Sequence, residues 1–354
     1  MTVIWLAGNR IRGTNADRLN TTGIGNSVGS WKELGRATGS GDDITVSNLP
    51  NKRYYMILTN NIAGSGTVYV GLRSGSGSVD TGNNYSDIDS LDGGVFANTI
   101  NSNFIITGCN TTNPQSFELA YASNLSNKEK LFQSWQCFQN TAGAGTAPRR
   151  IETYGKWVNT SNALDSLTYH NSGGGDMGSG SEIVVLGWDT TDTHTTNFWE
   201  ELGSTVLGSA GTDLDITSFT AKKYLWVQVY LQGTAFAEPT MTFNNDTTTY
   251  SWRRSANGGA DSTSVSQAHC GIAQGIGGGA PMFYNMFIVN NSANEKLGIS
   301  HGVSQFTAGA GNVPDRNEVV FKWDETASQI SRIDINSSSG NFGIGSTLKV
   351  WGSN

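Results

Sequence analysis

A segment of 17 residues that occurs twice constrains this chain more than any other feature. The segment TAGAGTAPRRIETYGKW, residues 141–157, returns as TAGAGNVPDRNEVVFKW at residues 307–323. The glycines, the proline, one arginine, one glutamate and the closing Lys-Trp pair keep their places at a constant separation of 166 residues. Self-similarity at a fixed long spacing indicates that one folding unit has been duplicated and fused.

Further matches extend the duplication over nearly the whole chain of 354 residues, which is longer than one core usually supports. Copy one begins at Trp31-Lys-Glu-Leu-Gly35 and copy two at Trp199-Glu-Glu-Leu-Gly203. The predicted organisation is an N-terminal arm (1–29), a first repeat (30–188), a linker (189–198) and a second repeat (199–354). Because the linker is short, the repeats should be near neighbours in a fairly fixed relation.

Each repeat is predicted to be all-β. Glycine is abundant, at 45 residues, yet aromatic residues reach 10%, which is typical of short strands joined by many turns. In residues 224–231, Leu225, Val227 and Val229 share one face while Tyr224 and Trp226 share the other, which predicts a central strand covered on both sides. Roughly eight strands per unit favour two tandem antiparallel β-sandwiches of the jelly-roll type; an immunoglobulin-like sandwich is the alternative, although it needs only ~100 residues.

The charge pattern argues against two classes of partner. The formal net charge is −7 and only 14% of the residues are charged, so bulk electrostatics would not attract nucleic acid or an anionic membrane. No apolar stretch approaches the roughly 20 residues of a transmembrane helix. The sequence therefore predicts neither nucleic-acid binding nor membrane insertion.

No constellation of residues predicts catalysis, a metal or another cofactor. The linker residues Asp189, Asp192 and His194 lack a fourth ligand, and no Gly-x-Ser-x-Gly elbow is present. The equivalent glutamates Glu152 and Glu318 lie one in each repeat, so they are expected to pair with nearby arginines, Arg150 and Arg316 among them. We therefore expect a protein that is not an enzyme.

The middle of each repeat is where the copies diverge. Asp87 and Asp89 of the first repeat fall where Trp252 and Arg254 stand in the second, beside Arg253. We interpret this as an acidic loop exchanged for a basic, aromatic one. The acidic loop lacks the ligand alternation of an EF-hand, so a solvated turn is favoured over calcium. For the loop at Trp252, contact with another protein, contact with a glycan and ordinary surface all stay open.

Other aromatic and sulfur-containing residues are expected to be structural. Four tryptophans occupy positions of the repeat signature and are predicted to lie in the core: Trp31, Trp157, Trp199 and Trp323. The three cysteines, Cys109, Cys137 and Cys270, form no CxxC pair and are expected to be buried thiols.

The repeat signature, W-x-E-L-G, N-Y…N-G-G, E-K-L, T-A-G-A-G-x-x-P-x-R and K-W, resembles that of tandem repeats in virion structural proteins of environmental tailed phages. The resemblance covers residues 31–354 and implies a capsid-surface or tail component of the virion, assembled in the host cytoplasm. It implies as partners copies of this chain and other virion proteins. The N-terminal arm could fold back on its own repeat or cross to a neighbouring subunit. The alternative function is a carbohydrate-binding or host-receptor-binding fibre module that contacts a host-surface glycan through Trp252.

Overall fold

The computed structural model describes residues 31–112, 115–189, 192, 197–233, 238–272, 281–305, 307 and 309–354. The N-terminal arm predicted for residues 1–29 lies outside them. All regular structure in the described part is β-strand, and no helix there is long and apolar enough to cross a membrane.

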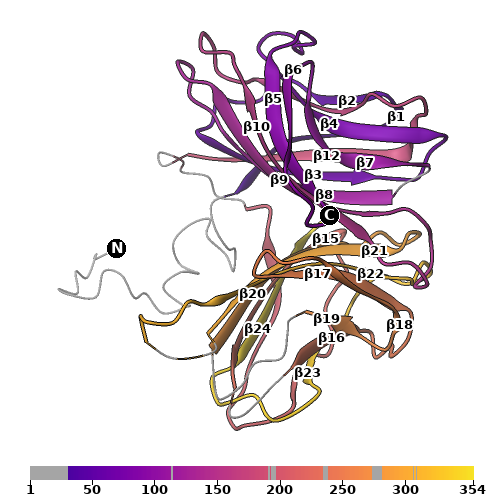
Figure 1. Cartoon of the computed structure of the whole chain (residues 1–354), viewed down its shortest axis with the longest axis vertical. Coiled ribbons are helices and arrows are strands. Elements are labelled where there is room, and N and C mark those ends of the chain that lie inside the picture. The colour runs from indigo at the N-terminus through magenta and orange to yellow at the C-terminus, as the bar shows by residue number, and fades with distance from the viewer. Residues whose placement is uncertain are drawn as a thin grey trace, which may run out of the picture.

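Among the described residues, residues 32–188 of repeat 1 form twelve strands and residues 200–353 of repeat 2 form another twelve (Figure 1). The strands of repeat 1 are β1 (Lys32–Gly41), β2 (Asp43–Val46), β3 (Tyr54–Asn61), β4 (Thr67–Gly75), β5 (Tyr85–Leu91), β6 (Ala97–Ser102), β7 (Ile105–Thr112), β8 (Gln115–Ser123), β9 (Lys130–Gln139), β10 (Arg149–Trp157), β11 (Ser166–Asn171) and β12 (Met177–Trp188). Those of repeat 2 are β13 (Glu200–Val206), β14 (Asp213–Ile216), β15 (Tyr224–Gln232), β16 (Pro239–Phe243), β17 (Tyr250–Ala256), β18 (Ser262–Gln267), β19 (Cys270–Gly271), β20 (Pro281–Val289), β21 (Lys296–Ser304), β22 (Asp315–Trp323), β23 (Ile333–Ser337) and β24 (Thr347–Ser353).

Each repeat is a jelly roll. In repeat 1 the antiparallel pairs β1–β12 and β3–β8 lie in one sheet, and the pairs β2–β11 and β4–β7 lie in the other. This nested pairing of early strands with late ones is the jelly-roll pattern. Repeat 2 has the same order, with β13–β24 and β15–β20 in one sheet and β14–β23 and β16–β19 in the other. The prediction of two homologous β-sandwiches is confirmed.

Four extra strands widen the larger sheet of each repeat to eight strands, so the expected number of roughly eight strands per unit was too low. In repeat 1 these are β9, β10, β5 and β6, in that order across the sheet, and in repeat 2 they are β21, β22, β17 and β18. They widen the outer face of the large sheet, which is the face turned away from the sandwich core. The contact between the repeats forms on this outer face.

The signature residues hold the same internal cluster in each repeat. The Trp157 indole donates a hydrogen bond to Asp80 (2.8 Å), and Lys130 lies over the indole at 5.6 Å while donating to the carbonyl of Asn159 (2.7 Å). In repeat 2, Trp323 and Lys296 make the equivalent contacts, with Asp246 as acceptor. The Lys-Trp and Glu-Lys-Leu motifs are therefore conserved between the copies because they meet inside each sandwich.

Each sandwich has its own core, and a third core joins the two. Leu225, Val227 and Val229 face the core of repeat 2, whereas Tyr224 belongs to the third core on the outer face, which confirms the central strand predicted there. The third core takes the following buried side chains from both repeats: Met56, Leu58, Phe117, Leu119, Cys137, Val184 and Leu186, with Phe198, Trp199, Tyr224, Phe287, Val289, Leu297, Ile299, Val320 and Trp351.

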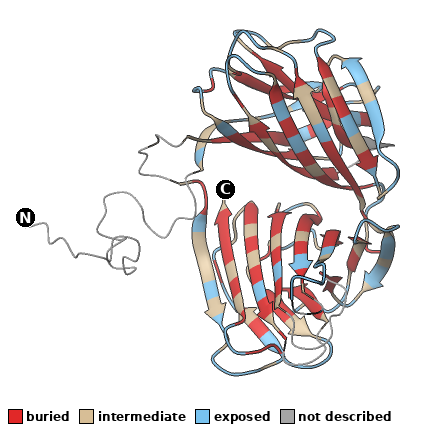
Figure 2. Cartoon of the chain, turned by 60° about the vertical axis from the view of Figure 1, so that its left-hand side comes forward, coloured by how far each residue is buried: buried red, intermediate tan, exposed pale blue. Residues whose placement is uncertain are grey.

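This third core packs the outer faces of the two large sheets against each other (Figures 1 and 2). A buried apolar contact of this extent fixes the relation of two domains more firmly than a linker can. The two repeats therefore behave as one body, as the short linker suggested.

Candidate functional site

The residues predicted to form an acidic contact loop lie instead on strand β5. Asp87 is buried and points inward, where one carboxylate oxygen accepts a hydrogen bond from the Ile106 amide (3.2 Å). Burial raises the pKa of Asp87 to about 6 and also raises the pKa of Asp89. The loop assignment is wrong because the stretch pairs with β10 on one side and β6 on the other. Contact of these residues with a neighbouring chain stays a prediction.

Trp252 likewise lies on a strand, β17, and packs against the core of repeat 2. Its ring is half-buried, with the Arg254 guanidinium 5.2 Å from the ring centroid. Its indole also lies close to Gly271, where an added Cβ would meet the ring at 3.0 Å. A ring held in this way does not present a free face for a sugar to stack on.

Arg253 faces repeat 1 and joins the two repeats. Its guanidinium lies 3.2 Å from the carboxylate of Asp92 and donates a hydrogen bond to the carbonyl of Pro148 (3.0 Å). The basic residue Arg253 of repeat 2 thus does pair with an acidic residue of repeat 1. The acidic partner is Asp92, and the ion pair forms within one chain.

Arg150 is the centre of a buried charge network between the repeats. Its side chain is 6% exposed and lies 3.1 Å from Glu152, 3.0 Å from Glu318 and 3.1 Å from Asp261. Burial alone would lower the pKa of Arg150, but the hydrogen bonds to Asp261 and the neighbouring negative charges raise it overall. The predicted pairing of both glutamates with arginines is confirmed, since Arg316 also contacts Glu318 (2.9 Å).

The glycine-rich loop of repeat 1, residues 141–148, docks on repeat 2. Lys322 donates a hydrogen bond to the Thr141 carbonyl (2.8 Å), and the Gly143 amide donates to Glu295. The Ala144 amide donates to Asp324 (3.0 Å). The Ser266 amide donates to the Ala144 carbonyl (2.8 Å), and Ser251 donates to the Thr146 carbonyl (3.1 Å). We call the receiving surface the docking face of repeat 2: Ser251, Arg253, Ser266, Glu295, Lys322 and Asp324.

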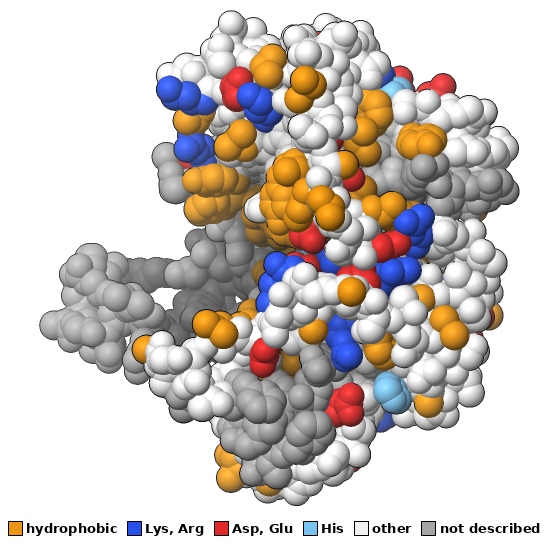
Figure 3. All heavy atoms as spheres, viewed as in Figure 1, with side chains coloured by type: hydrophobic (Ala, Val, Ile, Leu, Met, Phe, Trp, Pro, Cys, Tyr) orange, Lys and Arg blue, Asp and Glu red, His pale blue; other side chains and the backbone are white. Residues whose placement is uncertain are grey.

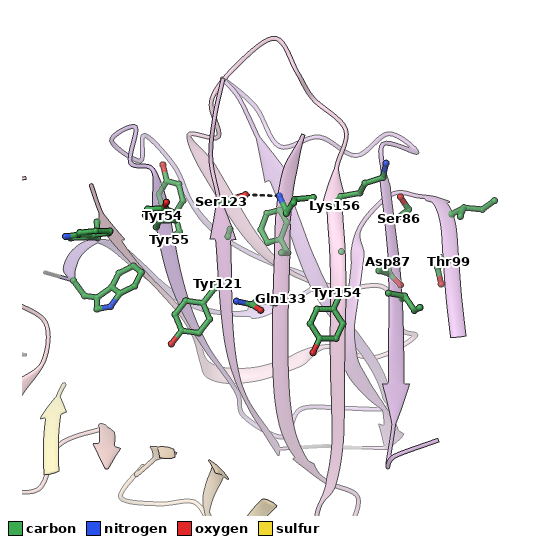
Figure 4. A pocket seen from close by; sticks show the side chains of 18 residues that line it. Tyr54, Tyr55, Ser86, Asp87, Thr99, Tyr121, Ser123, Gln133, Tyr154 and Lys156 are labelled. Carbon is green, nitrogen blue, oxygen red and sulfur yellow. Dashed lines mark hydrogen bonds between the residues drawn. The ribbon is translucent and has the colours of Figure 1, made fainter. Parts of the chain in front are cut away.

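An open depression lies on the outer face of repeat 1, beyond the edge of the third core. It encloses about 900 Å³, and we call it the repeat 1 hollow. Tyr121, Gln133 and Tyr154 stand side by side on adjacent strands β8, β9 and β10 (Figure 4). Its apolar and aromatic rim includes Trp31, Tyr54, Ile88, Ile100, Leu131 and Trp188, and its polar groups include Ser86, Ser123 and Lys156.

Several of these side chains are unusually exposed for their type. Leu131 is 58% exposed and Ile100 71%, and Tyr54, Ile88 and Tyr154 are also exposed. Apolar side chains gather on this part of the upper repeat in the space-filling view (Figure 3). On a soluble protein, a contiguous exposed apolar area of this kind is typical of an interaction site.

Sequence reasoning did not single out the hollow, although a signal was present. The strands β8 to β10 carry apolar residues on both faces, and both faces of such strands must be covered. Trp31, expected in the core, is only half-buried because it stands at the rim of the hollow, whereas Trp157, Trp199 and Trp323 are buried as predicted.

Within the described residues, no group of three or more His, Cys, Asp or Glu side chains is placed to hold a metal ion. Asp192 pairs with Lys52, while His194 lies outside the described part. Cys137 and Cys270 are buried thiols, as expected, and the Cys137 thiol donates a hydrogen bond to the Phe321 carbonyl (3.6 Å). The side chain of Cys109 lies outside the described part.

No family model and no curated protein matches this sequence. Among solved structures, domains LG4-5 of the mouse laminin alpha1 chain are similar, with 10% identity over 92% of this chain and 91% of that chain and a TM-score of 0.18. Ail, the attachment invasion locus protein of Yersinia pestis, has 8% identity over 77% of this chain and 98% of that chain, with a TM-score of 0.12. Neisserial surface protein A has 8% identity over 81% and 99%, with a TM-score of 0.11. Similarities at this level carry no argument about function.

Proposed function

We propose that this protein is a structural component of a virion, at the capsid surface or in the tail, and that it acts by assembly rather than by catalysis. The doubled jelly roll supports the proposal, since jelly rolls are recurrent building blocks of viral capsids. So does the resemblance of the repeat signature to phage virion proteins.

The observation that carries the proposal is the rigid fusion of the two repeats together with the apolar face that repeat 1 leaves open. A protein made for a static array needs a subunit that does not flex and a surface on which a neighbour can sit. The third core and the Arg150 network supply the first, and the repeat 1 hollow supplies the second.

The test is the composition of purified particles. Virions from cells that express this sequence would be banded on a density gradient and quantified by mass spectrometry. We expect the chain to co-band with the particle at a fixed, high copy number. Recovery of the chain only in the soluble fraction of the lysate, with none on the particles, would overturn the proposal.

A second candidate function is glycan binding. The residues that line the hollow support it, whereas the packing around Trp252 does not. Tyr54, Tyr121 and Tyr154 offer aromatic rings beside the polar side chains of Gln133 and Ser86, a combination suited to a sugar ring. A glycan array comparing Tyr154→Ala with Trp252→Ala separates the two sites. Specific binding lost only in Tyr154→Ala would support a glycan site in the hollow; no binding by the unmodified protein would count against it.

A further inference from the structure

The repeat 1 hollow occupies the position in repeat 1 that the docking face occupies in repeat 2. Strand pairing places Ser86 where Ser251 stands, Leu131 where Leu297 stands and Lys156 where Lys322 stands. The repeat 2 residues are covered by repeat 1, and Leu297 is fully buried whereas Leu131 is 58% exposed. The hollow is therefore a docking face that lacks its covering repeat.

Four of the six groups that receive the loop of repeat 1 have counterparts around the hollow. Lys156 corresponds to Lys322, Glu129 to Glu295 and Ser86 to Ser251. The fourth is the Ser266 amide, whose counterpart belongs to Asn101. Both of these residues hold a positive φ, 50° for Ser266 and 53° for Asn101, so the two backbones present the amide in the same local conformation.

One conserved ion pair shows the difference most directly. Lys322 and Glu295 lie 3.6 Å apart, with side chains 0% and 4% exposed under the docked loop. Lys156 and Glu129 form the same pair at 3.0 Å, with side chains 42% and 39% exposed. The chain thus carries a second copy of the loop-binding pair that nothing within the described chain covers.

The matching loop is also present and exposed. Residues 307–311 repeat TAGAG, and Gly309 has φ 98° against 88° for Gly143 of the docked loop. Ala144 and Pro148 are buried by docking, whereas Ala310 and Pro314 are exposed. Repeat 2 therefore presents an exposed copy of the loop that repeat 1 docks on repeat 2. We call this copy, residues 309–314, the free loop.

The two groups that do not correspond change in a coordinated way. Arg253 and Asp324 of the docking face correspond in repeat 1 to Ile88, which lines the hollow, and to Val158; these are 42% and 38% exposed. Where the docked loop has Ala147, the free loop has Val313, which is 87% exposed. On the repeat 1 side, two charged groups of the internal interface are thus replaced by apolar side chains. On the loop side, an alanine is replaced by the larger valine, so the two sides can pack together through apolar groups.

The rest of the outer face of repeat 2 is more polar than its counterpart in repeat 1. Leu58, Leu119 and Val184 of the third core correspond to three polar residues: Gln228, Asn285 and Lys349. A contact between chains through this face would bury less apolar area than the internal contact does. It would therefore be weaker and reversible, as assembly from soluble subunits requires.

We propose that copies of this chain associate head to tail, with the free loop of repeat 2 (Gly309–Pro314) docking in the repeat 1 hollow of the next copy. The occupant of the hollow is thus a second copy of the chain. Repeat 2 of each copy would then be related to repeat 1 of the next copy roughly as repeat 1 is related to repeat 2 within one chain. The contact is heterologous, so it generates a ring if the rotation closes and a filament if it does not. This inference rests on the proposed structural role and names the partner of the hollow.

The experiment uses two variants of the full chain at exposed positions. Ala310→Glu places a charge on the free loop and leaves the hollow intact, while Leu131→Glu places a charge in the hollow and leaves the loop intact. Val206→Glu, at an exposed site on edge strand β13, is the matched control. Mass would be measured by light scattering after size exclusion, over a hundredfold range of concentration up to about 1 mM.

We expect the unmodified protein and the control to form oligomers as concentration rises, and each test variant to need at least about tenfold more protein to associate. Mixing the two test variants should restore one interface only. The mixture should therefore give a species of twice the 37.7 kDa chain mass that grows no further. Such rescue is specific to a head-to-tail contact.

Three outcomes would overturn the inference. These are an unmodified chain that stays monomeric throughout, oligomers that persist in both test variants, and a mixture without the double-mass species. A glycan array in which Leu131→Glu alone loses a signal, with a monomeric unmodified chain, would instead assign the hollow to a sugar. None of these results bears on whether the chain is present in purified particles. Failure of the head-to-tail inference is therefore distinct from failure of the proposed structural role.

Discussion

Replacing Arg150 by alanine should weaken the contact between the repeats more than any other single charge removal in the network around it. The guanidinium lies between three carboxylates, those of Glu152, Asp261 and Glu318, whose side chains are 8%, 3% and 11% exposed. In Arg150→Ala these carboxylates would face one another with little water to screen them.

The magnitude follows from the burial of all four groups. Removing one partner of a buried ion pair generally costs about 3–5 kcal/mol, because an uncompensated charge is left in a poorly solvated place. Arg316 occupies the equivalent position in repeat 2 and also contacts Glu318, but its side chain is 53% exposed. Arg316→Ala should therefore cost no more than about 1 kcal/mol, and it is the matched control.

Urea unfolding followed by tryptophan fluorescence and by circular dichroism provides the measurement, because the third core contains several tryptophans. The two probes should give coincident transitions for the unmodified chain.

Equal midpoints for Arg150→Ala and Arg316→Ala would refute this reasoning, since burial is the main difference between the two positions.

Further predictions concern other buried groups. Glu118 is fully buried among Ser134, Thr59 and Thr107, and burial raises its pKa to about 7. The folded state keeps a proton that the unfolded chain loses above about pH 4.5, so stability should fall as the pH rises from about 4.5 to about 7; Glu118→Gln should remove this part of the dependence, and equal slopes for both proteins would contradict it. Trp199→Ala should cost about 3–5 kcal/mol because Trp199 is fully buried in the third core. Trp31→Ala, at the equivalent but half-buried position, should cost less than about 2 kcal/mol in the same urea assay, and equal costs would contradict the assignment of Trp31 to the rim of the hollow.

Much of the fold could be predicted because it depends on local sequence patterns that occur twice in the chain. The alternation of Leu225, Val227 and Val229 with Tyr224 and Trp226 predicts a two-faced central strand, and the structure has one. The duplicated motifs predict two copies of one sandwich. Pairing of Arg150 with Glu152 was also expected, because the two residues lie two positions apart and so share a strand face.

The predicted contact loops failed for a physical reason. The short polar stretches around Asp87 and Trp252 have the composition of turns, and nothing local distinguishes a polar turn from a strand near the edge of a wide sheet. Their strand conformation is set by pairing with β10 and β22, which are far away in sequence. β7, which is also distant in sequence, packs across Asp87, and its Ile106 amide donates a hydrogen bond to the Asp87 carboxylate.

The sequence by itself determined that the chain is two copies of one β-sandwich, since strand alternation and duplication are properties of local order along the chain. Only the tertiary structure decided how the copies meet. Identical motifs, such as the Lys156–Glu129 and Lys322–Glu295 pairs, became exposed in one repeat and buried in the other. The physical reason is that burial depends on what packs above a residue, and repeat 1 covers repeat 2 in an offset arrangement that leaves one docking face open.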